Sequence, residues 1–239
     1  MELLPIRTVD AAHAAVWRIG RAPEPWMWVD KEYAFTNRWD DIDRVFRTVY
    51  AGDSRYACFV EVLAYARPDR VGDVDVVNAV GIVEDPDDLT EFPVPPASEI
   101  PRDWFSRKRI GFATLDGVYA DVRASQTIAA LRPHFLRLAD KLGYPDFDAA
   151  ALKSAEPREL TQRVAKHLYA HAGDDGRLLL DGVRFASRHG DELAMWAIFE
   201  RPGDDPISRQ LSPAAPDPIF NEDDDLLRAF QLHRLRWKD

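Results

Sequence analysis

The order of strand-like and helix-like segments restricts the fold of this chain more than any other feature of its sequence. Amphipathic stretches with one apolar face predict helices at 54–66, 128–142 and 158–171. Stretches that are rich in valine or alternate in polarity predict strands at 16–19, 71–83, 110–115, 183–187 and 193–200. Because the two kinds of segment do not alternate regularly, the sequence predicts an α+β fold with a mixed sheet and flanking helices, and not a doubly wound sheet.

Caps and prolines mark the ends of several predicted helices. Asp53 or Ser54 is expected to cap the helix at 54–66, because a short polar side chain can accept a hydrogen bond from the first helical turn. Pro133 is expected in the first turn of its helix. The acidic residues of NEDDDLLRAF predict another helix start, where the macrodipole favours negative charge. Short helices are also predicted at 11–15 and 40–47, and a strand is predicted to end near Tyr50.

Two stretches dense in proline and acid interrupt these patterns. Proline cannot donate a backbone hydrogen bond, so Glu84–Asp103 and Arg201–Pro218 are predicted to be extended surface loops within one fold. The sequence therefore predicts a single domain over 1–239, with an inserted loop and helical region at about 84–156.

Charge and apolar run length limit the classes of protein to which the chain can belong. Its net charge of −10 argues against a general nucleic-acid binder, which must neutralise phosphates. The basic strip at Arg107–Arg109 is interpreted as a solvated edge. No apolar run approaches the roughly 18 residues of a membrane span, and Cys58 is the single cysteine, so no intrachain disulfide can form. A cytoplasmic protein that binds no membrane is expected.

Several common catalytic and ligand-binding motifs are absent from the sequence. There is no GxGxxG after a strand, no phosphate-binding GxxxxGK[ST] and no GxSxG nucleophile elbow. His167 and His171 have the spacing of two ligands on one helical face, yet no glutamate follows His167 and no cysteine cluster accompanies them. They are interpreted as surface histidines, and no metal is expected.

Three short segments hold the residue types that a nucleotide-cleaving site needs. They are WRIG at Trp17–Gly20, YAGDSRYACFVE at Tyr50–Glu61 and GVRFASRHG at Gly182–Gly190. In this order they supply Arg18, Tyr50, Glu61 and Ser187, and the step NRW before Tyr50 adds Arg38. Their order and local spacing resemble the RES domain family, which is named for an arginine, a glutamate and a serine. The later PRELTQRVAKHLY and MWAIFE strengthen this resemblance, which covers most of the chain.

The resemblance implies a fold related to ADP-ribosyltransferases and an enzyme that consumes NAD as its substrate. Glu61 and Arg18 would be catalytic, and Arg18, Arg38, Tyr50 and Ser187 would bind the dinucleotide. This chemistry suits the residues: arginine binds phosphate through a planar fork, tyrosine stacks on a cationic ring, and a carboxylate stabilises a ribose with oxocarbenium character. No cofactor is expected, and inorganic phosphate is a candidate co-substrate.

The reaction and the partners remain open at this point. NAD could be cleaved by phosphate or by water, or ADP-ribose could be transferred to a protein or nucleotide; a non-catalytic nucleotide- or partner-binding protein is a third alternative. Several RES proteins are toxins of bacterial toxin–antitoxin pairs, so a helix-turn-helix antitoxin is an expected partner, and a homo-oligomer is also allowed.

Overall fold

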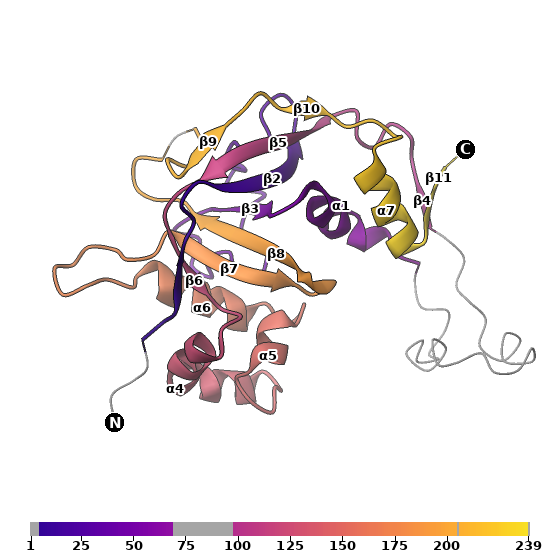
Figure 1. Cartoon of the computed structure of the whole chain (residues 1–239). Helices are drawn as coiled ribbons and strands as arrows, with labels where there is room; N and C mark the ends of the chain where they lie inside the picture. The colour runs from indigo at the N-terminus through magenta and orange to yellow at the C-terminus, as the bar shows by residue number, and fades with distance from the viewer. Residues whose placement is uncertain (1–4, 69–97, 205, 239) are drawn as a thin grey trace, which may run out of the picture.

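A nine-stranded, strongly curled sheet forms the centre of the computed structural model, which describes residues 5–68, 98–204 and 206–238 (Figure 1). The strand order is β1-β6-β7-β8-β3-β2-β5-β10, and β9 also pairs with β5. Only the β6–β7 pair is parallel, so the sheet is mixed. The strands are β1 (Thr8–Asp10), β2 (Ala14–Arg21), β3 (Thr48–Gly52), β5 (Lys108–Leu115), β6 (Val118–Asp121), β7 (Gly182–Ser187), β8 (Gly190–Phe199), β9 (Leu211–Pro213) and β10 (Asp217–Pro218).

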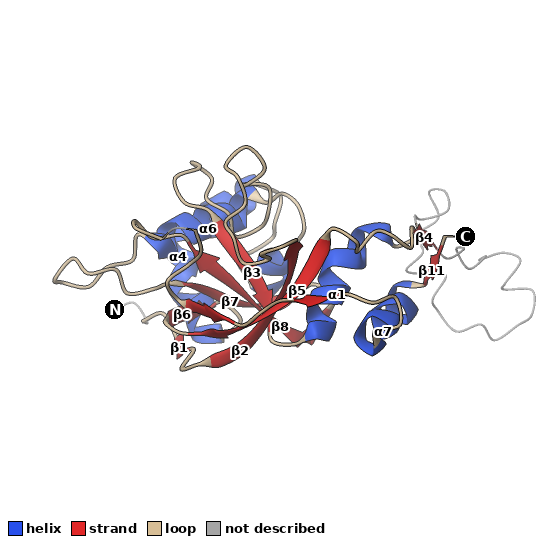
Figure 2. Cartoon of the chain, turned by 90° about the horizontal axis from the view of Figure 1, so that it is seen from above, coloured by secondary structure: helices blue, strands red, loops and turns tan. Residues whose placement is uncertain are grey.

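The helices cover one side of this sheet in two groups. Figure 1 places α4, α5 and α6 near β6 and β7, and both Figures 1 and 2 show α1 and α7 together at the other end. A small parallel sheet of β4 (Ser98–Ile100) and β11 (Leu235–Trp237) lies beside the second group. The helices are α1 (Arg55–Leu63), continued by the 3₁₀ turn Ala64–Ala66, then α4 (Ser125–Lys141), α5 (Ala149–Lys153), α6 (Glu159–Tyr169) and α7 (Asp224–His233). The α+β prediction is confirmed.

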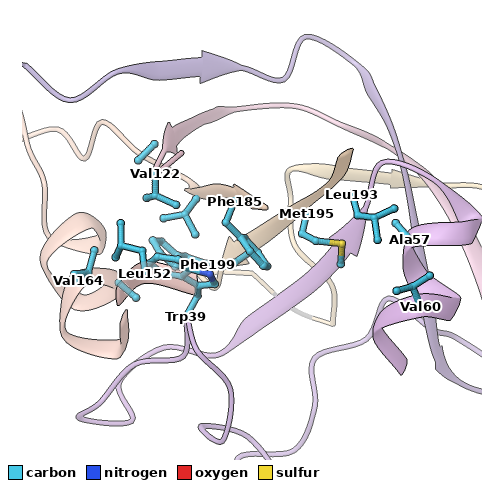
Figure 3. Packing of buried hydrophobic residues seen from close by; sticks show 14 of the residues in the cluster. Trp39, Ala57, Val60, Val122, Leu152, Val164, Phe185, Leu193, Met195 and Phe199 are labelled. Carbon is cyan, nitrogen blue, oxygen red and sulfur yellow. The ribbon is translucent and has the colours of Figure 1, made fainter. Parts of the chain in front are cut away.

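One apolar core joins both helix groups to the sheet. Figure 3 shows Trp39, Val122 and Leu152 near Phe185 of β7, while Val60 of α1 packs at the other end of the same cluster. The helices reach this core because their apolar residues recur at helical spacing, as in the buried face of α6 formed by Leu160, Val164 and Leu168. A second buried cluster, which includes Trp26, Trp28 and Trp196, covers the opposite face.

Two predicted short helices are wrong: strand pairing replaces the first, and side-chain hydrogen bonds to the backbone replace the second. At 11–13 the chain turns between β1 and β2, with φ of 44° at Ala12 and 65° at His13, and Ala14 and Ala15 already belong to β2. At 40–47 buried carboxylates bind backbone N–H groups instead of leaving them to a helix: the Asp41 Oδ2 accepts from the Val45 N–H at 2.6 Å. Strand pairing at 14–15 and the Asp41 hydrogen bond at 40–47 therefore override local helix preference.

The predicted insertion at about 84–156 also needs correction. Residues 84–97 lie outside the described part of the chain, but 98–156 contain β5 and β6. β5 pairs with β2 over eight residues, so this region supplies strands of the central sheet and is more than a loop and helical addition. Pro133 is also misplaced by the prediction, because it lies in the middle of α4 and not in its first turn.

The other predicted elements are recovered within a few residues of their expected ends. The helices at 54–66, 128–142 and 158–171 correspond to α1 with its 3₁₀ turn, α4 and α6, and β7 and β8 form the predicted hairpin. The predicted strand at 71–83 lies outside the described residues. No helix among the described residues is long and apolar enough to cross a membrane.

Candidate functional site

A seam between β2 and β3 places Arg18. These strands share one register pair, Trp17 with Gly52, so few backbone groups pair across the seam and a side chain can bridge it. The Arg18 Nε donates to the Pro25 carbonyl at 2.8 Å, and its Nη1 donates to the Tyr50 carbonyl at 2.9 Å. Burial lowers the pKa of Arg18, and nearby acidic groups oppose this shift. Arg18, the predicted phosphate-binding arginine, therefore also bridges β2 and β3. Its Nη2 makes no hydrogen bond to the described residues.

Tyr50 is held by its hydroxyl. The hydroxyl donates to the Asp40 Oδ1 at 2.8 Å and accepts from the Trp39 N–H at 3.0 Å. Its ring meets Phe185 edge-on, with 6.3 Å between ring centroids. Burial raises the pKa of Tyr50 well above its usual value, and the negative charge of Asp40 adds to the shift. Asp40, whose side chain is buried, was not predicted as a site residue, because an acid after NRW has no distinctive sequence signal.

Glu61 lies in the last turn of α1. The helix begins after Ser54, whose Oγ accepts from the Ala57 N–H at 3.1 Å, as predicted for the cap. Small and apolar neighbours, Ala57 and Val60, are fully buried beside Glu61. The Oε1 of Glu61 is buried and has no hydrogen-bond partner within the described chain. A buried carboxylate oxygen without a donor is costly, and this one marks Glu61 as a candidate for binding a ligand.

Arg38 and Arg67 lie within electrostatic range of Glu61. Burial lowers the pKa of Arg38, and the nearby Glu61 carboxylate and Tyr50 oppose this shift, whereas Arg188 and Arg158 add to it. The same carboxylate also opposes the lowered pKa of Arg67, which results first from burial and then from Arg188. Two arginines thus interact with one carboxylate, an arrangement that favours an anionic ligand next to it. The sequence pattern gave no reason to single out Arg67 or Arg188.

Arg38 lies between the charge cluster, formed by Glu61, Arg38 and Arg67, and a cavity of about 470 Å³. Its Nη1 donates to the carbonyls of Leu152 and Lys153, at 3.3 and 3.1 Å, and its guanidinium carbon lies 5.1 Å from the centroid of the Phe185 ring. The cavity has an apolar wall, in part from Phe185 and Leu152, and charged groups including the Asp121–Arg123 ion pair. Its volume lies in the range of small-molecule sites.

Ser187 closes the β7–β8 hairpin. It is buried, and its Oγ accepts from the His189 N–H at 2.9 Å. No hydrogen bond joins it to Glu61 within the described residues. Four of the predicted residues are thus linked: Arg18 bonds the Tyr50 carbonyl, and the charge of Arg38 interacts with Tyr50 and Glu61. Ser187 is connected to them only through His189, which interacts with Arg38 and Arg67.

The ring of His189 lies among positive groups. Burial lowers its pKa to about 4, and Arg67 and Arg188 contribute to the shift. An unfolded histidine has a pKa of about 6.5, so between these values the unfolded chain binds a proton that the folded chain does not. The free energy of unfolding is therefore expected to decrease as the pH drops from about 6.5 to about 4. Above about pH 6.5 His189 is neutral in both states, and this loss of stability is absent.

Urea unfolding at several pH values tests this expectation. His189→Asn should reduce the slope of the free energy of unfolding against pH in this window, by the equivalent of up to about one bound proton. Gln231→Ala, which removes no titratable group at an exposed position, is the control and should leave the slope unchanged. An unaltered slope in the His189 variant would show that this ring does not titrate as described.

Of the two histidines that the sequence spaces like metal ligands, His167 lies on α6 and His171 follows just past its end. His167 and His171 lie along a shallow groove with His134 of α4, and the His134 and His167 rings are 5.1 Å apart between centroids. Across 5–68, 98–204 and 206–238, no three or more His, Cys, Asp or Glu side chains are arranged to hold a metal ion.

The single cysteine lies buried on α1. Burial raises the pKa of the Cys58 thiol to about 12, which disfavours the thiolate that a nucleophilic cysteine needs.

Comparisons with known proteins bear on this geometry. The family model described as RES domain matches residues 15–217, which include all five predicted site residues. A search of curated proteins returns no match. Among solved structures, the crystal structure of the M. tuberculosis MbcT–MbcA toxin–antitoxin complex is similar, with a TM-score of 0.48 and 16% sequence identity, over 95% of this chain and 92% of that one.

Proposed function

Because this chain belongs to the RES domain family, we propose that it consumes NAD by breaking the bond between nicotinamide and its ribose. The observation that carries the proposal is the unpaired, buried Oε1 of Glu61, which lies close to Arg38 and Arg67. NAD combines an anionic pyrophosphate with a ribose that becomes positively charged as the bond breaks. A carboxylate surrounded by arginines offers a group for each part.

In the proposed reaction, Glu61 stabilises the positive charge that develops on the ribose. The C1′–N bond breaks, and its electron pair leaves with nicotinamide, which becomes neutral. An oxygen of phosphate or of water then bonds to C1′; when water attacks, one proton is released. The Oε1 is effective because it needs no rearrangement of protein hydrogen bonds to face the charge.

The arginines and the tyrosine hold the substrate in this proposal. Arg18 has one terminal amino group free for a phosphate oxygen, and Arg38 lies between Glu61 and the cavity. The ring of Tyr50 is fixed in orientation by Asp40, which suits it to line the nicotinamide side of the site. Ser187 is proposed to act by shaping the hairpin that presents His189.

The cavity beside Arg38 is proposed to receive the second nucleoside of the dinucleotide. Its apolar wall suits a flat base, and Arg38 stands where the phosphates would pass from the cavity to Glu61. NAD should therefore be a better substrate than nicotinamide mononucleotide, which cannot fill this cavity. A toxin role with a helix-turn-helix antitoxin is part of the proposal at the level of the family.

Product analysis tests the proposed function. The purified protein is incubated with NAD, with and without phosphate, and products are separated by chromatography. Nicotinamide release that requires phosphate indicates phosphorolysis, and release in its absence indicates hydrolysis. Label transferred from NAD to a protein or nucleotide would indicate ADP-ribosyl transfer. Measurable NAD binding with no product under any condition would contradict the proposal and favour a binding protein.

A further inference from the structure

The C-terminal helix α7 lies beyond the family match, which ends at residue 217, yet it packs against the helix that carries Glu61. Asp223 caps α7 and forms an ion pair with Arg55 in the first turn of α1. Arg228 lies over the ring of Tyr56, with its guanidinium carbon 4.2 Å from the ring centroid. These contacts tie the start of α1 to α7.

A second set of contacts ties the end of α1 to α7 through His233. This side chain is 2% exposed, and its Nε2 lies 2.8 Å from the carbonyl oxygen of Val60. Its Nδ1 accepts a hydrogen bond from the Arg67 Nε at 2.7 Å. Because Nδ1 is an acceptor, Nε2 carries the proton and donates to Val60. Both ring nitrogens are therefore occupied.

The end of α1 is shaped so that the Val60 carbonyl can accept this bond. The helix tightens into a 3₁₀ turn, in which the Ala64 N–H bonds the Glu61 carbonyl. In a continued α-helix that N–H would bond Val60 instead. The imidazole of His233 thus replaces a helical hydrogen bond at the residue that precedes Glu61.

The second partner of His233 belongs to the charge cluster around Glu61. The guanidinium of Arg67 is close enough for the Glu61 carboxylate to oppose the burial that lowers its pKa. With its Nε donated to His233, Arg67 is left with its terminal amino groups for other acceptors. One imidazole therefore orients both the backbone of α1 next to Glu61 and a cation near the carboxylate.

We propose that His233 is a positioning residue of the Glu61 site, acting through the Val60 carbonyl and the Arg67 guanidinium. The inference rests on the proposed NAD cleavage. It assigns to α7, which the family match does not include, a part in holding the carboxylate in its reactive position. Small displacements of a reacting group reduce rates strongly, so the effect should appear in kcat.

Three substitutions separate the two bonds. His233→Phe keeps an aromatic ring and removes both bonds; His233→Asn keeps an acceptor for Arg67 but is too short to reach Val60. His233→Gln offers an amide that reaches the Val60 carbonyl. The Phe variant should lower kcat for nicotinamide release by about tenfold with little change in KM, and the Gln variant should recover much of the loss. Gln231→Ala, at an exposed position on the same helix, is the control.

The measurements distinguish positioning from simple support of the fold. Thermal unfolding gives the folded fraction, and kcat is expressed per folded molecule. Arg67→Met should lower kcat by a similar factor, and the double variant with His233→Phe should lose less than the product of the two factors. Nitrogen NMR shifts of the His233 ring report its Nε2–H tautomer independently of activity.

The outcomes are separable from those of the proposed function. If the wild type cleaves NAD and a folded His233→Phe protein retains the wild-type kcat, the positioning role is wrong. If His233→Phe does not fold, Arg67→Met and His233→Gln decide the question in the same assay. If the wild type cleaves no NAD, the function fails, and the tautomer measurement still tests the hydrogen bonds themselves.

Discussion

Glu61→Gln is expected to reduce kcat/KM for NAD cleavage by about 10²–10³-fold, the range seen when a preorganised group at a developing charge is removed. Glutamine has nearly the same shape as glutamate, so the packing of α1 should persist. The substitution removes the negative charge from a buried position whose Oε1 has no hydrogen-bond donor. The free energy of unfolding should therefore change by less than about 1 kcal/mol.

Nicotinamide release and thermal unfolding, measured on the same preparation, check this result. Glu32→Gln alters an exposed glutamate and should change neither quantity. A Glu61→Gln protein that unfolds like the wild type and keeps at least half of its activity would remove Glu61 from the reaction. An inactive wild type would instead reject the proposed function as a whole.

Gly182→Ala is expected to lower the free energy of unfolding by about 3 kcal/mol, because no space exists for a side chain there. Gly182 begins β7 in the interior of the sheet, paired with β6 on one side and β8 on the other. A Cβ at this position would lie 2.0 Å from the Ala197 carbonyl oxygen and 3.0 Å from the Tyr119 ring. The nearest obstacle is backbone, so the strands themselves must move.

Urea unfolding followed by circular dichroism measures this loss, which corresponds to a decrease in Tm of about 10 °C for a chain of this size. Gly173→Ala is the matched control. Its Cβ would meet the Asp175 side chain at 3.2 Å, and that group can rotate away. A Gly182→Ala protein as stable as the wild type would mean that β7 and β8 can separate without cost.

The elements that the sequence predicted correctly are those whose pattern is local. The helix over 54–66 has its cap at Ser54 and its apolar face on consecutive turns, so both signals lie within the segment. The segment 11–15 was mispredicted because its conformation depends on β1 pairing with β6 and β2 pairing with β5, in both cases about 100 residues away. Strand order in the sheet is a long-range property of the same kind, which periodicity does not encode.

The site was predictable in part for a similar reason. Arg18, Tyr50 and Glu61 lie in short segments with distinctive spacing, and the structure joins them through the β2–β3 seam and the charge cluster. Arg67 and His233 were not found because each is an isolated residue whose role depends on its partner. Their sequence separation of 166 residues leaves no pattern to detect.

The position of α7 in the chain has a consequence for when the site is assembled during translation. The ribosome makes α1 early, but the His233 that bonds the Val60 carbonyl follows 173 residues later, after every strand of the large sheet. A nascent chain can therefore pair its sheet while the turn that carries Glu61 still lacks this partner. Under the proposed function, the Glu61 site would lack the His233 hydrogen bond until α7 has been made.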